Sequence, residues 1–228
     1  MARKILHVLE DMGLTIKQPE NGYRFSVDSL LLADFCRLRR QDCVLDLGTG
    51  SGVIALVLAK KYPEISVTAL EIQKRLVEFA LLNARQNGLE RQIKVIHGDL
   101  NNIDRVLMAQ SMDHVVANPP YRPPVSGRIC INSMEALARH EILTDIERVT
   151  QAARYVLRPM GRFSVIFPAE RVAGLVTTLT ANRMEPKRMQ MVHPDERSKA
   201  RMCMIEACRD AGRELHILPP IFLNSPDT

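Results

Sequence analysis

The stretch Cys43–Tyr62, CVLDLGTGSGVIALVLAKKY, decides the fold of this 228-residue chain. It begins with CVLDL, a short apolar run that is typical of a buried β-strand. It ends with VIALVLAKKY, which fits a buried helix that Pro63 terminates. The loop GTGSG (48–52) joins the two. A strand, a glycine-rich loop and a helix in this order predict an α/β unit that binds a ligand at the loop.

The same alternation of strands and helices continues toward the C-terminus. Further strands are expected at ISVTALE (65–71), QIKVIHGD (92–99), DHVVAN (113–118) and RFSVIF (162–167), with helices at 73–87, 146–157 and 169–183 and a turn at 159–161. MQMVHP (189–194) and ARMCMIEACRD (200–210) are separated by a polar turn, so they are expected to pair antiparallel. This pattern therefore predicts an α/β fold with a doubly wound, Rossmann-like sheet. That sheet is mostly parallel and has an antiparallel strand near the C-terminus.

The segment before the first strand is expected to extend this core. Residues 14–25, LTIKQPENGYRF, alternate around a turn-forming cluster and predict a hairpin. Asp28 is placed to cap a helix over SLLLADFCRL. Because there is no repeat or linker, residues 1–228 are expected to form a single domain. It would consist of an extension over about 1–40 and a core over about 41–228.

The composition is that of an ordinary soluble globular protein, 46% hydrophobic and 25% charged. A formal net charge of +5 suits a polyanionic partner such as RNA, although many soluble proteins carry a similar basic excess. Five cysteines without a Cys-x-x-Cys pair indicate neither a disulfide framework nor a zinc site, and no metal is expected. No apolar run approaches the ~20 residues of a membrane span. A signal-peptide pattern is also missing, so a cytoplasmic protein is expected.

Asp46 lies just before the glycine loop and restricts its ligand. A nicotinamide site would show Gly-x-Gly-x-x-Gly, and a P-loop would show Lys-Ser or Lys-Thr after the glycines; this loop shows neither pattern. An acid at this position would repel a pyrophosphate. It suits the positively charged amino-acid end of S-adenosyl-L-methionine.

Acids also end the next two strands. Glu71 could accept hydrogen bonds from ribose hydroxyls and Asp99 from an adenine amine, at the strand ends where open parallel sheets bind ligands. Each acid alone is often a cap, a turn former or an ion-pair partner, but the joint arrangement predicts a site for S-adenosylmethionine. The apolar side chains of Ile72 and Leu100 could cover the faces of the adenine. The predicted cofactor-binding residues are Asp46, Gly48, Thr49, Gly50, Ser51, Gly52, Glu71, Ile72, Asp99, Leu100 and Asn118.

The fourth strand ends in Asn118-Pro119-Pro120-Tyr121 beside the same crevice. Taken alone, the two prolines only terminate a strand. Together with the glycine loop, the quartet resembles the class I methyltransferases of amino groups, which act on adenine or cytosine amines or on a glutamine amide. The oxygens of the Asn118 side chain and the Pro119 carbonyl could each accept one N–H of the amine. Tyr121 could stack on a flipped-out base, so all four residues are predicted to be catalytic.

Further segments narrow the resemblance. NGYRFSVDSLLLADF (21–35), ALEIQ (69–73), ARHE (138–141) and MVHPDERSKARMCMIEACR (191–209) are similar to the bacterial tRNA adenine-N6-methyltransferases, which modify the adenine beside the anticodon of a valine tRNA. The likeness runs from about Leu14 to Phe222 and implies transfer of a methyl group to the N6 amine of an adenine in tRNA. The alternatives are a protein glutamine amide, another RNA or DNA amine, or a non-catalytic RNA-binding scaffold.

Basic residues near the final strand pair and next to the Asn118–Tyr121 quartet indicate a surface for RNA binding. Contacts with RNA phosphates would supply the affinity. For any single one of them, a solvated surface position is the more common role. The cluster comprises Arg122, Arg128, Arg183, Lys187, Arg188, Arg197, Lys199 and Arg201, and the predicted substrate-binding residues among these are Arg122, Arg188, Arg197, Lys199 and Arg201. The sequence leaves open which tRNA is used and the oligomeric state, with a monomer favoured.

Overall fold

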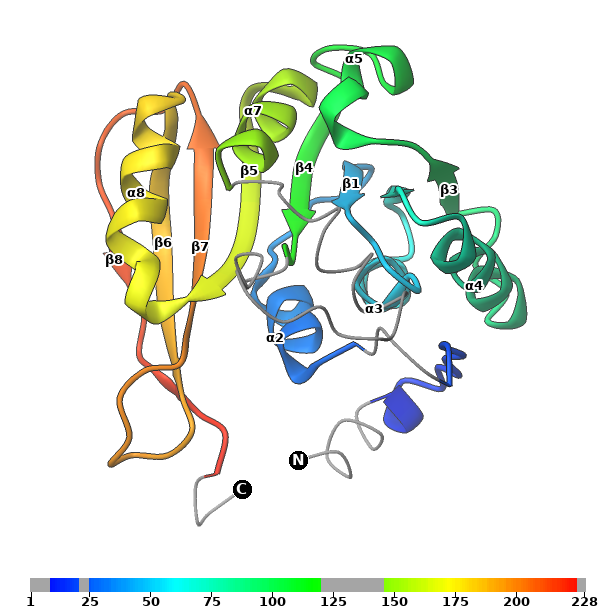
Figure 1. Cartoon of the computed structure of the whole chain (residues 1–228), viewed down its shortest axis with the longest axis horizontal. Helices are drawn as coiled ribbons and strands as arrows, with labels where there is room; N and C mark the ends of the chain where they lie inside the picture. The colour runs from blue at the N-terminus through cyan, green and yellow to red at the C-terminus, as the bar shows by residue number, and fades with distance from the viewer. Residues whose placement is uncertain (1–8, 21–24, 120–145, 225–228) are drawn as a thin grey trace, which may run out of the picture.

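The computed structural model of the chain describes residues 9–20, 25–119 and 146–224. Its centre is a sheet with the strand order β3-β2-β1-β4-β5-β7-β6-β8, and β9 pairs with β6 (Figure 1). The strands are β1 Cys43–Leu47, β2 Ser66–Glu71, β3 Ile93–His97, β4 Met112–Ala117, β5 Leu157–Pro168, β6 Met184–His193, β7 Met202–Arg209, β8 His216–Ile217 and β9 Ile221–Phe222.

The strands β3, β2, β1, β4 and β5 are parallel, and β7 lies antiparallel between β5 and β6. This confirms the predicted mostly parallel sheet with a reversed strand near the C-terminus. Because β5 and β6 both run opposite to β7, β6 ends at the same side of the sheet as the parallel strands. We call this side, where β1 to β6 end, the carboxyl edge.

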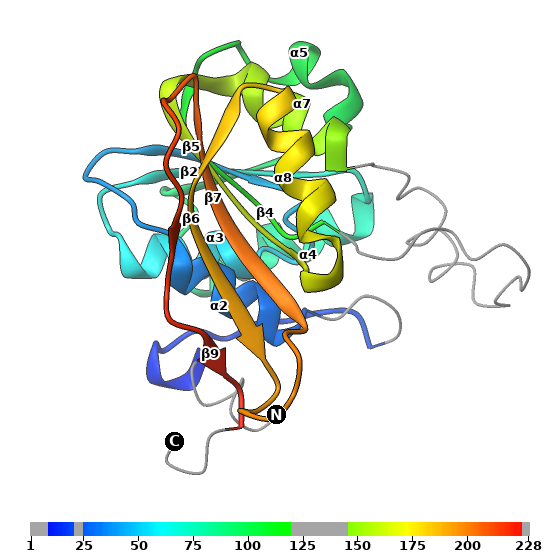
Figure 2. The same cartoon turned by 90° about the vertical axis from the view of Figure 1, so that its left-hand side faces the viewer.

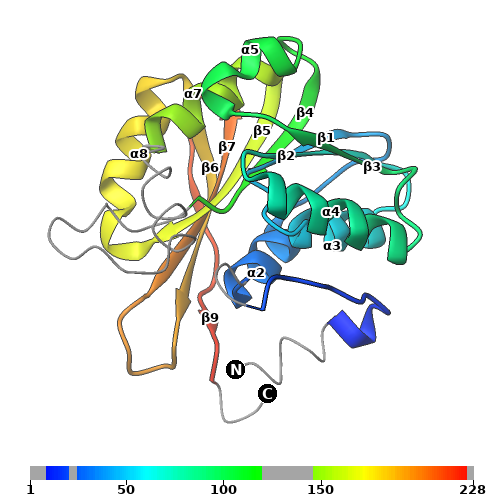
Figure 3. The same cartoon turned by 45° about the vertical axis from the view of Figure 1, so that its right-hand side comes forward.

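Helices cover both faces of the sheet, as Figure 3 shows. Alternate residues of each strand point to opposite faces, so neighbours such as Val44 and Leu45 belong to different hydrophobic clusters. One cluster includes residues of α2 and α3, and the other includes residues of α5, α7 and α8. The helices are α2 Val27–Phe35, α3 Val53–Lys61, α4 Lys74–Gln86, α5 Ile103–Val106, α7 Ile146–Val156 and α8 Val172–Ala181, with 3-10 turns η1 Leu100–Asn102 and η2 Ala169–Arg171.

The N-terminal segment differs from the predicted hairpin. Residues 14–20 and 25–26 contain no strand, and residues 21–24 lie outside the described part of the chain. Instead, Thr15 and Lys17 donate their backbone N–H groups to the side-chain oxygens of Asn87 (2.9 Å) and Asn83 (2.8 Å) on and just after α4. Asn83 Nδ2 donates back to the Lys17 carbonyl at 2.8 Å. Side-chain amides of a helix therefore satisfy the backbone groups that a second strand was expected to pair.

Two boundaries also differ from the sequence prediction. Ser26, not Asp28, is the N-cap of α2. Asp28 lies in the first turn, where its carboxylate accepts a hydrogen bond from Ser26 Oγ at 2.9 Å and interacts favourably with the helix dipole. Strand β5 begins at Leu157, because Leu157 already pairs with Met112. The predicted turn at 159–161 is a bulge inside β5, since the next pair along the ladder is His114 with Arg162. The short strands β8 and β9 were not predicted.

Candidate functional site

The glycine loop turns sharply at the carboxyl edge, directly after β1. Gly48, Gly50 and Gly52 have φ angles of 78°, 60° and 89°, a left-handed backbone that other residues rarely adopt. The loop is fastened to β2, because the N–H groups of Gly48 and Thr49 both donate to the Leu70 carbonyl, at 2.9 and 3.0 Å. A side chain at position 52 would place its Cβ 3.3 Å from Ala80 Cβ on α4. The loop therefore needs glycine both for its backbone and for its close approach to α4.

Asp46 lies buried beneath this loop and is 0% exposed. Its Oδ2 accepts from Thr49 Oγ1 and from the backbone N–H of Ala55 at 3.1 Å, whereas Oδ1 has no hydrogen-bond partner among the described residues. Burial raises the pKa of this carboxyl to about 7. A buried acceptor without a donor costs stability, so this atom fits a ligand that brings a positive, hydrogen-bonding group.

Glu71 ends β2 beside the loop and is 5% exposed. Its Oε2 accepts from the Gly50 N–H at 2.8 Å, and its Oε1 accepts from the Gln73 N–H at 2.9 Å. Burial raises the pKa of this carboxyl as well, while these backbone bonds oppose the rise. The sequence predicted that this carboxylate accepts hydrogen bonds from ribose hydroxyls. In the structure each oxygen already accepts from a backbone amide and the Ile72 N–H also acts on the carboxyl, so only its remaining acceptor positions are open to a ligand hydroxyl.

The third strand end carries the apolar and acidic groups expected beside an adenine. Asp99 is half-buried, and its Oδ1 accepts from the backbone N–H and the side-chain amide of Asn101, both at 2.8 Å, so it also forms the turn that starts η1. Leu100 is half-buried, and Ile72, which directly follows β2, is 41% exposed. The two side chains could cover a planar ligand between β2 and β3.

Asn118 follows the last residue of β4 and lies next to the glycine loop. Because Asp46 pairs with Val116, Asn118 and Gly48 each lie two residues beyond that pair. Its Nδ2 donates to Ser29 Oγ of α2 at 3.1 Å, and Ser29 is only 2% exposed. With Nδ2 held by Ser29, the side-chain oxygen points in a different direction within the amide plane, away from the Ser29 hydroxyl. Pro119 is buried beside it.

Sequence reasoning missed Ser29, which is separated from Asn118 by 89 positions. The only signal was its place in the segment RFSVDSLLLADF, which contributed to the family resemblance. The rest of the predicted catalytic and target-binding segment, including Pro120, Tyr121, Arg122 and Arg128, lies outside the described residues.

Arg188 was predicted to bind the substrate, and the structure contradicts this. It is 9% exposed, stacks over the Phe35 ring at 4.5 Å and donates from Nη2 to the Phe35 carbonyl at 2.7 Å. Its Nε lies 3.9 Å from Glu206 Oε1 of β7. Burial lowers the pKa of Arg188. The residue joins α2 to the sheet and is not part of an RNA-facing surface.

The remaining basic residues of the final strand pair divide between the two ends of the sheet. Arg197, Lys199 and Arg201 are exposed in the connection between β6 and β7, at the carboxyl edge (Figure 2). Arg183 precedes β6 at the opposite edge, where it is ion-paired with Asp210 at 3.1 Å. Lys187 donates to the Gly212 carbonyl at 2.8 Å. Only the first three therefore share an edge with the glycine loop and Asn118.

Within the described ranges, no three His, Cys, Asp or Glu side chains are grouped so that they could hold a metal ion. Over the same ranges, no helix is long and apolar enough to cross a membrane.

Comparison with known proteins places this geometry among methyltransferases. The model of the methyltransferase small domain family matches residues 24–172. A protein of Tolumonas auensis named tRNA1(Val) (adenine(37)-N6)-methyltransferase is 30% identical over 167 residues, which cover 73% of this chain and 68% of that protein. A protein of the same name from Shewanella frigidimarina is 30% identical over 183 residues, 75% of this chain and 70% of that protein.

Solved structures share the fold at lower identity. The crystal structure of an O-methyltransferase, described as predicted, from Agrobacterium tumefaciens has a TM-score of 0.71 at 20% identity and covers 88% of this chain and 89% of that one. The crystal structure of TrmN from Thermus thermophilus has a TM-score of 0.59 at 20% identity, covering 79% of this chain and 48% of that one.

Proposed function

Because the chain belongs to the methyltransferase small domain family, we propose that it transfers a methyl group from S-adenosylmethionine to the N6 amine of an adenine in tRNA. The observation that carries the proposal is the Asn118 amide, held by the buried Ser29 at the carboxyl edge directly beside the glycine loop.

The residues at this edge fit the cofactor. The unpartnered Oδ1 of Asp46 suits a nearby ammonium group, and Glu71 retains acceptor capacity for a ribose hydroxyl. Ile72 and Leu100 offer apolar surface to the adenine, and Asp99 can accept from its amine. When bound, S-adenosylmethionine supplies a methyl group on a positively charged sulfur, which is already strongly electrophilic.

The protein's part in the reaction is positioning and electrostatic stabilisation. The lone pair of an adenine amine is delocalised into the ring, so the amine is a weak nucleophile. Asn118 Oδ1 and the Pro119 carbonyl oxygen would each accept one N–H of the amine, which favours the pyramidal nitrogen whose lone pair can attack. The amine nitrogen would gain the methyl carbon while the carbon–sulfur bond breaks and its electron pair returns to sulfur. The nitrogen would become cationic and then release one proton to solvent, so no strong base is required. Tyr121 is proposed to stack on the base.

The exposed Arg197, Lys199 and Arg201 lie at the same edge and would contact RNA phosphates. Such contacts predict binding that weakens steeply as salt rises, whereas the choice of the amine depends on the pocket around Asn118.

The proposal is tested by mass spectrometry of nucleosides. Purified protein is incubated with S-adenosylmethionine and unmodified bulk tRNA, the tRNA is digested, and N6-methyladenosine is quantified. We expect it with the intact protein and with Asn182→Ala, a change at the opposite edge of the sheet, but not with Asn118→Ala. Unmodified tRNA despite cofactor binding would overturn the tRNA assignment, and glutamine-containing protein substrates would then be assayed.

A further inference from the structure

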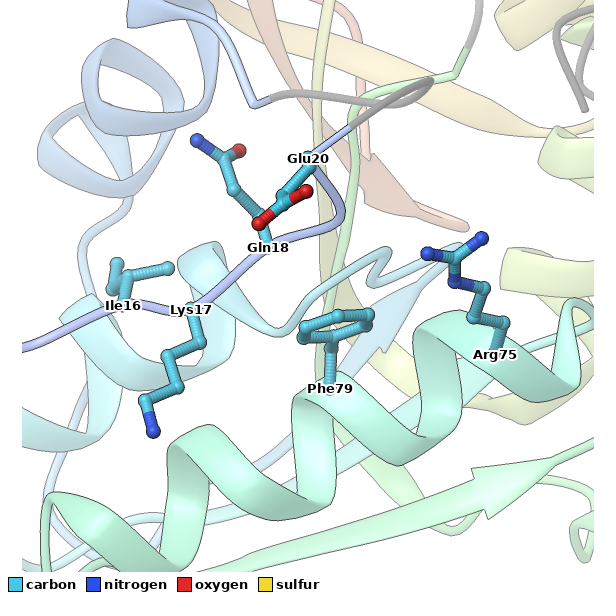
Figure 4. Close-up of a pocket in the computed structure, with 6 residues that line it drawn as sticks. All are labelled: Ile16, Lys17, Gln18, Glu20, Arg75 and Phe79. Atoms are coloured by element: carbon cyan, nitrogen blue, oxygen red, sulfur yellow. The ribbon is translucent and has the colours of Figure 1, made fainter.

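A second concave site lies beside the cofactor edge, between α4 and the N-terminal segment. It has a volume of about 600 Å³, and Figure 4 shows Arg75 and Phe79 rising from α4 toward the segment that carries Gln18 and Glu20. Its lining residues are Ile16, Lys17, Gln18, Glu20, Arg75 and Phe79. None of the residues assigned above to the cofactor or to the target amine is among them.

One wall of this pocket is fixed against the other by side-chain amides of α4 and its C-cap, of which Asn83 is buried. Asn83 is 0% exposed and forms two hydrogen bonds with the Lys17 backbone, both at 2.8 Å. Gln86 Nε2 and Asn87 Nδ2 both donate to the Thr15 carbonyl, at 2.6 and 2.8 Å. The segment thus runs along α4 from its C-terminal end toward its first turn. The pocket begins where these hydrogen bonds between α4 and the N-terminal segment end, so its position is set by the fold.

The pocket lies on the same side of the sheet as the reaction. Helix α4 starts at Lys74, three residues after the end of β2, so Arg75 lies at the carboxyl edge. Asn83 Nδ2 also donates to the Ser51 carbonyl of the glycine loop at 2.8 Å. Since β2 and β4 flank β1, their ends are about 10 Å apart. An RNA strand whose target base reaches Asn118 could therefore place a nearby nucleotide over α4.

We propose that this pocket binds one nucleotide of the RNA substrate other than the methylated adenosine, a proposal that rests on the proposed function. The half-buried ring of Phe79 offers a face for base stacking, which proteins use on single-stranded RNA segments. Arg75 and Lys17 lie on either side of that ring (Figure 4), and the exposed Lys17 can contact a flanking phosphate. The Gln18 side-chain oxygen accepts the Phe25 N–H at 3.3 Å, and the NH2 group of the same amide can donate to a base edge. The volume accommodates a nucleotide.

The experiment compares Phe79→Ala with Leu82→Ala, which shortens an apolar side chain on the same helix that is 41% exposed. Loss of one stack should raise the KM for tRNA and its Kd in filter binding about 5- to 160-fold. The kcat at saturating tRNA and the Kd for S-adenosylmethionine by calorimetry should stay within about twofold of the unmodified protein. Leu82→Ala should change none of these quantities.

Lys17→Ala provides an independent variant, because Lys17 is exposed and its loss should leave folding intact. We expect the slope of log Kd for tRNA against log salt to fall by about one. An unchanged tRNA Kd in both variants would overturn the proposal, as would an equal loss of cofactor affinity, which would assign the pocket to the cofactor. Filter binding measures the effect of the pocket variants on the Kd for tRNA even if no N6-methyladenosine forms. Failure of this proposal is therefore distinguishable from failure of the proposed function.

Discussion

The contact between Ser29 and Asn118 predicts a specific catalytic defect in Ser29→Ala. The hydroxyl accepts from Asn118 Nδ2 at 3.1 Å and is 2% exposed. A neutral buried hydrogen bond contributes about 0.5–1.5 kcal/mol. Its loss lets the amide rotate away from the orientation in which Oδ1 faces the target amine. If that whole amount is lost in the transition state, kcat falls about 2- to 12-fold.

The assay is single-turnover methylation of tRNA with both substrates saturating, followed by nucleoside mass spectrometry. Cofactor affinity should be unchanged, because within the described residues the Ser29 hydroxyl is hydrogen-bonded to Asn118 and to no other proposed cofactor residue. Ser164→Ala is the matched control: it removes another buried hydroxyl, one that is bonded to His114 Nε2 at 2.9 Å and not to Asn118. Its kcat should equal that of the unmodified protein.

A double-mutant cycle separates positioning from general destabilisation. If Ser29 acts through Asn118, Ser29→Ala should have no further effect on residual activity once Asn118 is alanine. An equal rate loss in both backgrounds would refute the reasoning, and so would a Ser29→Ala protein with full kcat.

Three further outcomes follow from the site and its supports. Because burial raises the pKa of Asp46 from 3.8 to about 7, the unliganded fold should lose stability as pH rises from about 4 to about 7. S-adenosylmethionine, whose ammonium needs the carboxylate, should bind more weakly below pH 7 in calorimetry, and Asp46→Asn should flatten that dependence. Gly52→Ala places a side chain at φ 89° and should cost about 1–2 kcal/mol, a fall in Tm of roughly 2–8 °C by calorimetry, together with weaker cofactor binding. Arg188→Ala leaves the Glu206 carboxylate buried without its cation and should cost roughly 3–5 kcal/mol in denaturant unfolding while the salt slope of tRNA binding stays unchanged. Arg197→Ala should lower the salt slope of tRNA binding and leave the free energy of unfolding nearly unchanged.

The alternation of strands and helices and the ligand-binding edge were predictable from the sequence, because their signals are local. The apolar runs at β1, β2 and β4 and the glycines at 48, 50 and 52 each specify a backbone conformation within a few residues. Parallel strands must end at a common edge, so Asp46, Glu71 and Asn118 were expected together, and the structure brings them there. The sequence alone determined the fold class and the chemistry available at that edge.

The tertiary structure alone decided which polar side chains are buried and which elements they join. Arg188 has the same charge as Arg197, yet it is buried against Phe35 while Arg197 is exposed. Ser29 is one of several serines, and only the packing of α2 against the end of β4 brings it to Asn118. Residues 14–20 have the alternation of a strand, but the amides of α4 satisfy their backbone. In each case the deciding partner lies more than 60 positions away, because burial and hydrogen bonding depend on how whole elements pack and not on the neighbouring sequence.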